Sequence, residues 1–479
     1  MSTPRVRIAP SPTGNLHVGT ARAALFNYLF AENQSGTFIL RIEDTDLERS
    51  DKKYEQNIFD GLRWLGINPD EGPEQGGPHA PYRQTERTAV YEKHIRQLLA
   101  ESKAFYCFHS EKELTAEKER MMAEKLPVLH GCAYRDMPPA EAEARVADIS
   151  DFIIRFKTPQ GRSIVFPDLI RGDVAFSSDL IGDFSIAKRP DVPLYNFAVV
   201  VDDHAMNITH VIRGEDHIAN TPKQILIAEA LGFPAVAYAH LPLILGADRS
   251  KLSKRHGAMS VDEYRQQGYL PEALFNFMAL LGWNPGGDQE IFSKEELIRI
   301  FSLEKVQKSG AIFDLKKLDW MNGEYIRALS VEELLVHAKD FLPKSHTLYP
   351  ASYVLKVLAL EQPRLKKLSE LAERVDYFFG ASAYEKDLLR WKSISDEDIA
   401  VSLEYCEQIL RSLGKGASKD TIENTFMEAI GEGDKGPILW PLRVALSGKK
   451  ASPGPFEIMA ILGVDESIGR VQAALQKVR

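Results

Sequence analysis

Two short segments, far apart in the sequence, carry residue types that suit a bound triphosphate. The first is PSPTGNLHVGT, residues 10–20, which we expect to join a buried strand to a helix. A helix N-terminus presents unpaired N–H groups and a partial positive charge, both of which favour anions. His17 can donate to phosphate oxygens, Thr20 follows in the same turn, and Gly19 leaves room for a base or a ribose. By itself the pattern is more typical of an ordinary junction with a surface histidine.

The second segment is KLSKR, residues 251–255. Lys251 and Lys254, with Ser253 between them, place ammonium groups on a loop that can close over a triphosphate and stabilise a developing pyrophosphate. Most lysine-rich pentapeptides are simply solvated. The occurrence of both segments in one chain favours a site that holds ATP from two sides, because phosphoryl and adenylyl transfer use a cationic loop and a helix N-terminus.

Acidic residues follow several segments that we expect to be strands. Glu43, Asp44 and Asp46 follow one of them, at the edge where open α/β sheets bind ligands, and a carboxylate there can hold a substrate ammonium group. A polar strand end without a ligand is an equally good interpretation. The Asp/Glu/His groups at 202–204 and 215–217 make a metallohydrolase an alternative. Their spacing lacks the HxH or HxxxH pattern, which ranks this alternative below nucleotide binding.

Two arginines lie within otherwise apolar predicted strands. A buried arginine normally needs an anionic partner. Arg7 and Arg213 therefore indicate either structural salt bridges or guanidinium groups that bind a substrate carboxylate through two hydrogen bonds. Tyr195 begins the strand predicted at 195–204 and is a candidate for the same pocket.

A CxH…HxC pattern, formed by Cys107, His109, His130 and Cys132, resembles a structural zinc site. The loop between the two pairs is long and charged, and Cys-x-His is an unusual pair for a zinc knuckle. On this spacing we favour the absence of a metal.

Composition limits the class of protein. The chain has 479 residues and a net charge of −9, which indicates several domains and argues against a globally basic nucleic-acid binder, although a basic stripe on an acidic body stays possible. Three cysteines form no disulfide framework and fit a reducing compartment. The sequence shows no apolar core of a signal peptide at its start and no apolar run that would span a bilayer. We therefore predict a cytoplasmic protein without membrane contact.

The order of elements predicts an α/β fold. A strand at 6–9, a helix, a strand at 38–42 and a helix at 54–65 alternate as in a parallel sheet with crossover helices. Residues 105–189 break this rhythm and read as an α+β insertion with its own small core. The rhythm returns with predicted strands at 195–204 and 209–217, and the last third of the chain is all-α.

Longer segments resemble the bacterial glutamyl-tRNA synthetases, which are class I aminoacyl-tRNA synthetases. HVGT is similar to the HIGH signature of that family and KLSKR to its KMSKS loop. The resemblance extends to RIEDTD, YNFAVVVDDH, VIRGEDH and GAIFDLKKLDWMNGEYI, covers nearly the whole chain, and is strongest over 5–65 and 190–325.

This resemblance implies a Rossmann-type catalytic domain with an α+β insertion, followed by an all-α anticodon-binding module. The implied parts are a catalytic first half at 1–104, an acceptor-stem-binding insertion at 105–189, a catalytic second half at 190–250, a KMSKS and stem-contact region at 251–329, and a helical anticodon-binding domain at 330–479.

The resemblance also implies the reaction and its partners. L-Glutamate and ATP, accompanied by Mg²⁺, would form an enzyme-bound glutamyl-adenylate, and glutamate would then pass to the 2′-OH of the terminal adenosine of tRNA(Glu). Adenylate formation in this family generally needs bound tRNA. We expect a monomer. Charging of tRNA(Gln) as well stays open.

Site residues are carried over position by position. Arg7 would bind the side-chain carboxylate of the substrate, Ser11 and Glu43 its α-amino end, and Tyr195 and Arg213 would complete the amino-acid pocket. ATP would be bound by the following residues: His17, Gly19, Thr20, Asp216, Lys251 and Lys254. Arg364 would read the anticodon.

Two features depart from the family pattern. Val199 stands where some relatives have asparagine in the amino-acid pocket, so that one polar contact is lost. Relatives with zinc have Cys-x-Cys and then Cys-x-His, whereas those positions here are Cys107, His109, Cys132 and Tyr134.

Four rivals are weighed against this interpretation. A glutaminyl-tRNA synthetase would have a β-rich anticodon region, and the truncated paralogue that glutamylates a tRNA base would lack the helical module. A non-catalytic tRNA-binding protein would have no need of His17, Lys251 and Lys254. A small-molecule nucleotidyltransferase would have no need of the long helical tail.

Overall fold

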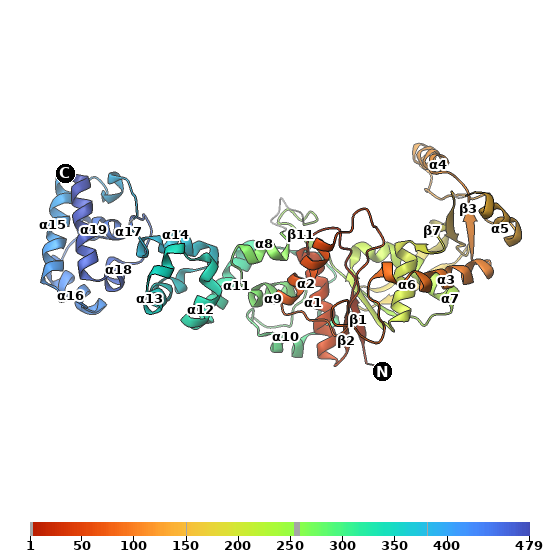
Figure 1. The fold of residues 1–479 in the computed structure, drawn as a ribbon, viewed down its shortest axis with the longest axis horizontal. Helices are drawn as coiled ribbons and strands as arrows, with labels where there is room; N and C mark the ends of the chain where they lie inside the picture. The colour runs from red at the N-terminus through yellow and green to blue at the C-terminus, as the bar shows by residue number, and fades with distance from the viewer. Residues whose placement is uncertain (1–2, 150, 253–258, 381) are drawn as a thin grey trace. The chain divides into compact units, whose positions relative to one another are not determined.

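The computed structural model describes residues 3–149, 151–252, 259–380 and 382–479. The chain forms two compact units: Met1–Tyr264 with Pro271–Leu315, and Arg265–Leu270 with Lys316–Arg479. Figure 1 shows the first with sheets and helices and the second with helices. Among the described residues, no helix has both the length and the apolar surface needed to cross a membrane.

The first unit contains the β-strands. Their bounds are β1 (Arg5–Ile8), β2 (Thr37–Leu40), β3 (Ala104–Cys107), β4 (Ile153–Phe156), β5 (Ser163–Asp168), β6 (Gly172–Ser177), β7 (Phe184–Arg189), β8 (Val192–Pro193), β9 (His210–Gly214), β10 (Ala237–Leu241), β11 (Ile244–Leu245) and β12 (Ala311–Ile312). Its helices are α1 (Val18–Asn33), α2 (Lys52–Trp64), α3 (Thr88–Ala100), α4 (Glu111–Ala123), α5 (Pro139–Asp148), α6 (Tyr195–Ala205), α7 (Thr221–Leu231), α9 (Pro271–Leu280) and α10 (Lys294–Ile300).

The strands that alternate with helices pair in parallel, as that alternation predicts. β1 pairs with β2 and β9 pairs with β10, both in parallel. The N–H of Thr209 donates to the carbonyl of Arg5 at 2.9 Å and thereby links β9 to β1. Parallel strands joined by helices bring their carboxyl ends to one edge, where a ligand site is expected. The Rossmann-type α/β fold is confirmed.

Helix α1 runs between the sheet and the helices α9 and α10, with which it packs. All of its residues from Ala21 to Leu29 are buried, which fits a helix enclosed on all sides. Its two buried polar side chains find carbonyl partners. Arg22 donates to the carbonyls of Leu281 and Pro242, and Asn27 donates to that of Ile212 at 3.0 Å.

The strand predicted at 195–204 is wrong, because this segment forms helix α6. Its run from Phe197 to Asp203 is buried without interruption. A short continuous apolar run fits a buried strand and a buried helix equally well, so periodicity does not separate the two. Asp202 and Asp203 therefore project from the end of a helix rather than from the end of a strand.

The predicted separate core of residues 105–189 is also wrong. β3, β4, β7 and β8 do form an antiparallel sheet of their own. Ile154 and Ile186 of this sheet, however, share one apolar core with Val199 of α6 and Ile227 of α7. The β5–β6 hairpin extends the sheet of β9 and β10, because Asp168 pairs in parallel with Tyr238 of β10. The five-part division of the chain stays a prediction.

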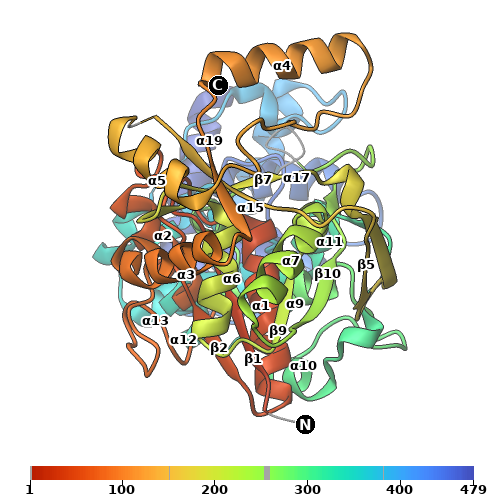
Figure 2. The same ribbon diagram turned by 90° about the vertical axis from the view of Figure 1, so that its right-hand side faces the viewer.

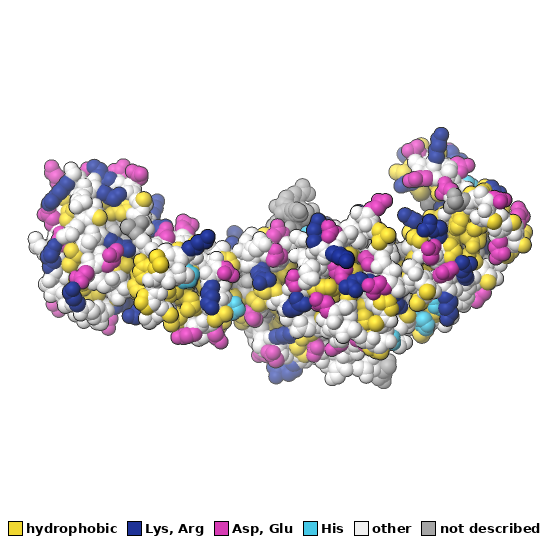
Figure 3. Space-filling model, in the orientation of Figure 1, with side chains coloured by type: hydrophobic (Ala, Val, Ile, Leu, Met, Phe, Trp, Pro, Cys, Tyr) yellow, Lys and Arg dark blue, Asp and Glu magenta, His cyan; other side chains and the backbone are white. Residues whose placement is uncertain are grey.

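The second unit is all-α in its described residues, as predicted. The chain passes between the two units within α8 (Val261–Gln266) and at the start of α11 (Leu315–Ala328). The further helices are α12 (Val331–Ala338), α13 (Ala351–Glu361), α14 (Leu371–Val375), α15 (Asp396–Ser412), α16 (Lys419–Ile430), α17 (Gly436–Ser447), α18 (Pro455–Leu462) and α19 (Val464–Val478). On the face drawn in Figure 3, basic and acidic side chains are interspersed over these helices.

Candidate active site

A cavity of about 650 Å³ opens at the carboxyl ends of β1 and β9 and at the N-terminus of α1. It lies entirely within the first unit. The predicted site residues that line it are Arg7, Ser11, His17, Gly19, Thr20, Glu43, Tyr195, Arg213, Asp216 and Lys251. The predicted residues Ser253 and Lys254 lie outside the described residues. Arg364 belongs to the second unit and is not part of this cavity.

His17 is the N-cap of α1, with an extended backbone at φ −82° and ψ 155°. Its side chain makes no capping hydrogen bond, and the first turn of α1 contains no acidic residue. The N–H groups and partial positive charge of this turn therefore lie at the cavity without a carboxylate of the helix itself. This arrangement suits the phosphates of a nucleotide.

Gly19 borders the cavity without being required by the backbone or by packing. A Cβ placed on it would meet no heavy atom within 4 Å. Because the added carbon would occupy open space, a side chain at this position would leave the fold undisturbed. It would instead narrow the space for a ligand that enters the cavity.

The residues that flank segment 253–258 are held close to this turn. Ser260 forms an isolated antiparallel bridge with His17, and the N–H of Val261 donates to the carbonyl of Leu16 at 2.9 Å. On the other flank, Lys251 bridges to Leu245 of β11. His17 and Lys251, one from each of the two segments that the sequence pointed to, thus line one cavity.

Arg213 is a buried guanidinium without a carboxylate partner among the described residues. Its side chain donates to Thr221 Oγ1 at 2.8 Å and to His240 Nε2 at 3.3 Å. No partner is found for Nη1 in the described part of the chain. Burial lowers the pKa of Arg213. A buried cation in this state is stabilised by an anion that enters the cavity.

Arg7 has the opposite environment, because it forms a structural salt bridge. Its Nε and Nη2 donate to the two carboxylate oxygens of Asp203 at 3.0 and 3.3 Å. Arg41, which is fully buried, donates to the same carboxylate at 2.7 Å. Burial raises the pKa of Asp203, but the two arginines outweigh it and the pKa is lowered. Sequence reasoning missed Arg41 and this role of Asp203; a signal was present in the charged residues set within apolar runs.

Of the three acidic residues after β2, Glu43 lines this cavity. It is buried and pairs with Arg41 at 3.2 Å. Burial raises the pKa of Glu43 despite the opposing charges of Arg41 and Arg7. Asp44 accepts instead from Thr85 and Asp46 from Arg49.

Aromatic and polar groups complete the cavity wall. The Tyr195 hydroxyl lies 3.0 Å from His217 Nδ1, and burial lowers the pKa of His217. Asp216 forms an ion pair with Lys251 at 3.7 Å. Val199 lines the cavity without offering a polar contact. His217 also lines the cavity. The sequence had indicated it only as a possible metal ligand in the group at 215–217.

The structure does not support the hypothesis that residues 202–204 bind a metal ion. Asp202 is fully buried and binds Arg87 Nε at 2.7 Å and the Tyr91 hydroxyl. The ring of His204 stacks on Phe233 at 3.7 Å between centroids. These side chains are occupied by packing and ion pairing, which removes the metallohydrolase alternative at this position.

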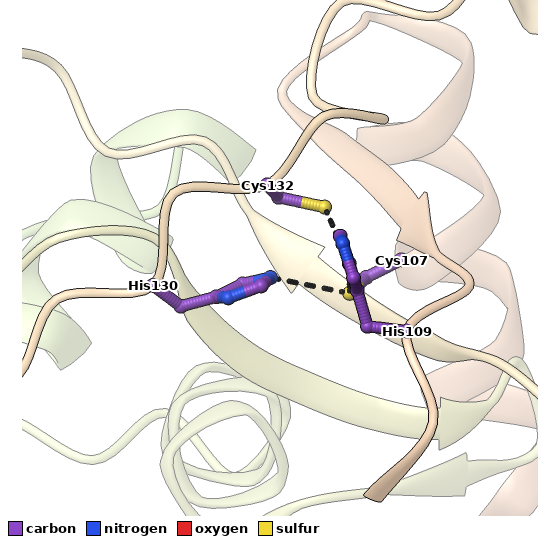
Figure 4. A group of neighbouring side chains, drawn as sticks. All are labelled: Cys107, His109, His130 and Cys132. Atoms are coloured by element: carbon purple, nitrogen blue, oxygen red, sulfur yellow. Dashed lines mark hydrogen bonds between the residues drawn. The ribbon is translucent and has the colours of Figure 1, made fainter. Parts of the chain in front are cut away.

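The four Cys and His residues of the insertion come together, contrary to the spacing argument. The ligand atoms of Cys107, His109, His130 and Cys132 all lie within 4.8 Å of one another (Figure 4). The long charged loop folds as α4 and returns to the end of β3. The spacing on which the absence of a metal was predicted is therefore no obstacle to one.

Comparison with known proteins follows the same division of the chain. The family model described as "tRNA synthetases class I (E and Q), catalytic domain" matches residues 4–320. The chain belongs to this family. A second model, described as "Anticodon binding domain", matches residues 333–475. The predicted fold class and family are confirmed.

Similar proteins extend over the full chain. A glutamate–tRNA ligase of Carboxydothermus hydrogenoformans is 46% identical over 478 residues, covering 98% of each chain. Glutamate–tRNA ligase 1 of Syntrophomonas wolfei is 45% identical over 480 residues, covering 99% of this chain and 97% of the relative. The crystal structure of a glutamate tRNA ligase from Elizabethkingia meningosepticum, in complex with its amino acid, matches with a TM-score of 0.89 and 33% identity over 100% of both chains.

Proposed function

We propose that this class I synthetase joins L-glutamate to the 3′ end of tRNA(Glu) in two ATP-dependent steps, for protein synthesis. Arg213 carries the proposal within the cavity, because a buried guanidinium without a carboxylate partner among the described residues suits an acidic substrate. The full-length similarity to proteins named glutamate–tRNA ligase supports the same conclusion.

The amino acid would lie between the cationic and the acidic side of the cavity. Arg213, together with Arg7, would bind the side-chain carboxylate. Glu43 and Ser11 would bind the α-amino group, since Glu43 is a carboxyl group at the cavity wall. Tyr195 would close the pocket. This arrangement leaves the α-carboxylate as the reacting group.

ATP would lie at the N-terminus of α1. An oxygen of the glutamate α-carboxylate attacks the α-phosphorus, and the bond to pyrophosphate breaks. His17 and the N–H groups of Gly19 and Thr20 would stabilise the growing negative charge, and Lys251 and Lys254 would hold the leaving phosphates. Asp216 would contact the adenosine.

Mg²⁺ would enter with the ATP phosphates. Among the described residues, the one group of three or more clustered metal-ligating side chains lies in the insertion and not at this cavity. The ion is therefore proposed as part of the nucleotide substrate, where it neutralises phosphate charge.

In the second step, the 2′-OH of the terminal adenosine attacks the carbonyl carbon of the adenylate, and AMP leaves. The insertion would bind the acceptor stem. The helical unit, with Arg364, would bind the anticodon. We further propose that the protein acts as a monomer in the cytoplasm.

ATP–pyrophosphate exchange tests the first step. The purified chain is assayed with glutamate or glutamine, with and without tRNA(Glu) or tRNA(Gln). We expect exchange with glutamate that depends on tRNA(Glu), and none with glutamine. Glutamate-dependent exchange supported equally by tRNA(Gln) would extend the substrate range. Exchange with glutamine alone, or none under any condition, would contradict the proposal.

A further inference from the structure

A buried histidine lies beside Arg213, behind the wall of the catalytic cavity. His240 on β10 and Arg213 on β9 are partners in the register of these two parallel strands. The side chain of His240 is fully buried, as is that of its partner Asp168. Among the described residues, those that line the cavity include neither of these two. His240 can therefore act on a bound substrate only through a residue of the wall.

One ring nitrogen of His240 is bound to a carboxylate. Nδ1 lies 2.6 Å from Asp168 Oδ2, and the backbone N–H of His240 donates to the same oxygen at 3.1 Å. Oδ1 of Asp168 accepts from the N–H groups of Ile170 and Arg171 at 3.0 and 2.9 Å. Burial raises the pKa of Asp168, but the hydrogen bonds from the imidazole and these N–H groups outweigh it and the pKa is lowered. Because an ionised carboxylate only accepts hydrogen bonds, Nδ1 of His240 carries the proton.

The second ring nitrogen of His240 then faces Arg213 as an acceptor. A neutral imidazole that donates through Nδ1 has its lone pair on Nε2. This Nε2 accepts from Arg213 Nε at 3.3 Å and lies 3.1 Å from Thr221 Oγ1. Burial lowers the pKa of His240, and the charge of Arg213 adds to this effect, while Asp168 opposes it. A protonated ring would direct an N–H and a second positive charge at the guanidinium.

These contacts leave one nitrogen of the guanidinium for a ligand. Nε of Arg213 donates to His240, and Nη2 donates to Thr221 Oγ1 at 2.8 Å. Nη1 has no hydrogen-bond partner among the described residues. Because a guanidinium is planar, acceptors at Nε and Nη2 fix the direction in which Nη1 points. Such orientation before binding lowers the cost of holding a carboxylate.

The carboxylate that supports His240 comes from the β5–β6 hairpin. Asp168 ends β5 and pairs with Tyr238 of β10, and Figure 2 shows β5 beside β10 and β9. The rings of Phe166 and Tyr238 lie 6.3 and 6.1 Å from the imidazole, between centroids. The imidazole is therefore held by a hydrogen bond and by packing within one sheet, which suits a fixed support for Arg213.

We propose that His240, held by Asp168, is a positioning residue that presents an acceptor to Arg213 Nε and so orients the guanidinium toward the side-chain carboxylate of glutamate. The inference rests on the proposed function, in which glutamate is the ligand of Arg213. His240 itself makes no contact with the substrate in this scheme. Glutamate binding should depend on the lone pair of Nε2, whereas ATP binding at the N-terminus of α1 should not.

Two amide variants separate positioning of Arg213 from support of the sheet. His240→Asn places an amide N–H near the position of Nδ1, so it keeps a donor for Asp168 and loses the acceptor for Arg213. His240→Gln places an amide oxygen near the position of Nε2, so it keeps the acceptor and loses the donor. We expect the glutamate KM to rise about 5- to 50-fold in His240→Asn and less than about threefold in His240→Gln. The kcat and the ATP KM should change less than about threefold in both, because only binding of glutamate is weakened.

His210→Asn is the matched control. His210 lies on the same strand as Arg213, its Nδ1 is 2.8 Å from Thr209 Oγ1, and the described residues that line the cavity do not include it. Its replacement should leave the glutamate KM within about twofold of the unmodified chain. A glutamate KM that rises in His240→Gln as much as in His240→Asn, or in neither, would overturn the positioning role. Absence of charging by the unmodified chain would contradict the proposed function instead.

Neutron diffraction from crystals of the unmodified chain tests the acceptor without any variant and without an activity assay. The method locates the exchangeable hydrogens of the imidazole as deuterium. We expect deuterium on Nδ1 of His240 and none on Nε2. Deuterium on Nε2, alone or together with Nδ1, would place a donor against Arg213 and overturn the proposal.

Discussion

Arg213 and Arg7 line the same cavity but differ in whether a carboxylate of the protein neutralises them. Arg7 shares Asp203 with Arg41, whereas Arg213 has no carboxylate partner among the described residues. In Arg213→Gln, loss of a charge-assisted contact with the substrate should raise the glutamate KM by about 10- to 100-fold. The KM for ATP should change less than about twofold, because the nucleotide would lie at the other end of the cavity. Steady-state charging assays measure both constants.

Thermal unfolding distinguishes the two arginines. Arg213→Gln should change the free energy of unfolding by less than about 1 kcal/mol, since no partner carboxylate is stranded. Arg7→Gln should cost about 1.5–3 kcal/mol, because Asp203 loses two hydrogen bonds from a charged donor. An unchanged glutamate KM in Arg213→Gln would refute the assigned role of this arginine.

Gly19 allows a test in which stability and activity move in opposite directions. Gly19→Ala places a methyl group in open space and removes backbone freedom from the first turn of α1. The free energy of unfolding should therefore rise by up to about 1 kcal/mol. The KM for ATP should rise at least about tenfold, because the methyl group faces the proposed nucleotide site. A stabilised variant with an unchanged ATP KM would show that the nucleotide does not approach this residue.

Individual site residues were easier to predict from the sequence than the residues with which they pair. The position of His17 before a helix and of Arg213 within an apolar segment both pointed to the cavity. The ion pair of Arg7 with Asp203 joins residues that lie 196 positions apart in the sequence, and no local pattern encodes such a pairing. The convergence of His130 on Cys107 was hidden for the same reason.

Helix α6 shows how one element supports the site through its buried charges. Asp202 accepts from Gln84 at 2.8 Å as well as from Arg87 and Tyr91, and so ties α6 to α3 and to the chain before it. Asp202→Asn should destabilise the protein by about 3–5 kcal/mol, because it leaves Arg87 buried without its anion. Denaturant unfolding gives this value.

The folded Asp202→Asn variant should keep the KM values for ATP and glutamate of the unmodified chain. Asp202 is not among the residues that line the cavity. A change in the ATP or glutamate KM of more than about tenfold, with stability unchanged, would reassign Asp202 from a structural to a catalytic position.

Most elements followed from local pattern, and the exceptions have physical causes. The helix predicted at 54–65 forms as α2, within two residues of both predicted bounds, because a cap and apolar spacing mark it. The run FAVVV in α6 has no polar alternation, so its helix was taken for a strand. The β5–β6 hairpin joins β10 through a single paired position, a contact that depends on the folded sheet rather than on sequence spacing.

At the scale of the whole molecule, the second unit provides the proposed contact with the far end of the tRNA. Arg364 is partly exposed and lines a cavity of about 390 Å³ together with Lys449. Arg364→Ala should raise the KM for tRNA(Glu) by about 5- to 50-fold, which corresponds to one or two lost hydrogen bonds. The ATP KM should stay the same, because Arg364 lies outside the catalytic cavity. Charging kinetics at varied tRNA concentration give these constants.

Arg411→Ala is the matched control for this change. Arg411 is an exposed arginine of α15 whose Nε donates to Glu407 on the same helix at 3.0 Å. Its replacement should leave the KM for tRNA(Glu) within about twofold of the unmodified chain, since a single exposed pair contributes little. Equal effects of the two substitutions would indicate a general loss of positive charge rather than recognition by Arg364.

Fold and family were readable from the sequence because motifs at both ends of the catalytic unit are highly specific in combination. The boundary between the two units was harder to predict from the sequence. The chain leaves the first unit within α8, returns at Pro271, and leaves again at Leu315, so that a short stretch of one unit lies within the sequence of the other. No linker composition marks that exchange.

Transfer of radiolabelled glutamate to tRNA(Glu) tests the central claim most directly. The purified chain, ATP and Mg²⁺ are incubated with intact tRNA(Glu) or with periodate-oxidised tRNA(Glu), which lacks the terminal diol. We expect ATP-dependent labelling of intact tRNA that mild alkali releases, as for an ester, and no labelling of the oxidised tRNA. Failure to label intact tRNA(Glu), or equal labelling of the oxidised form, would contradict the account.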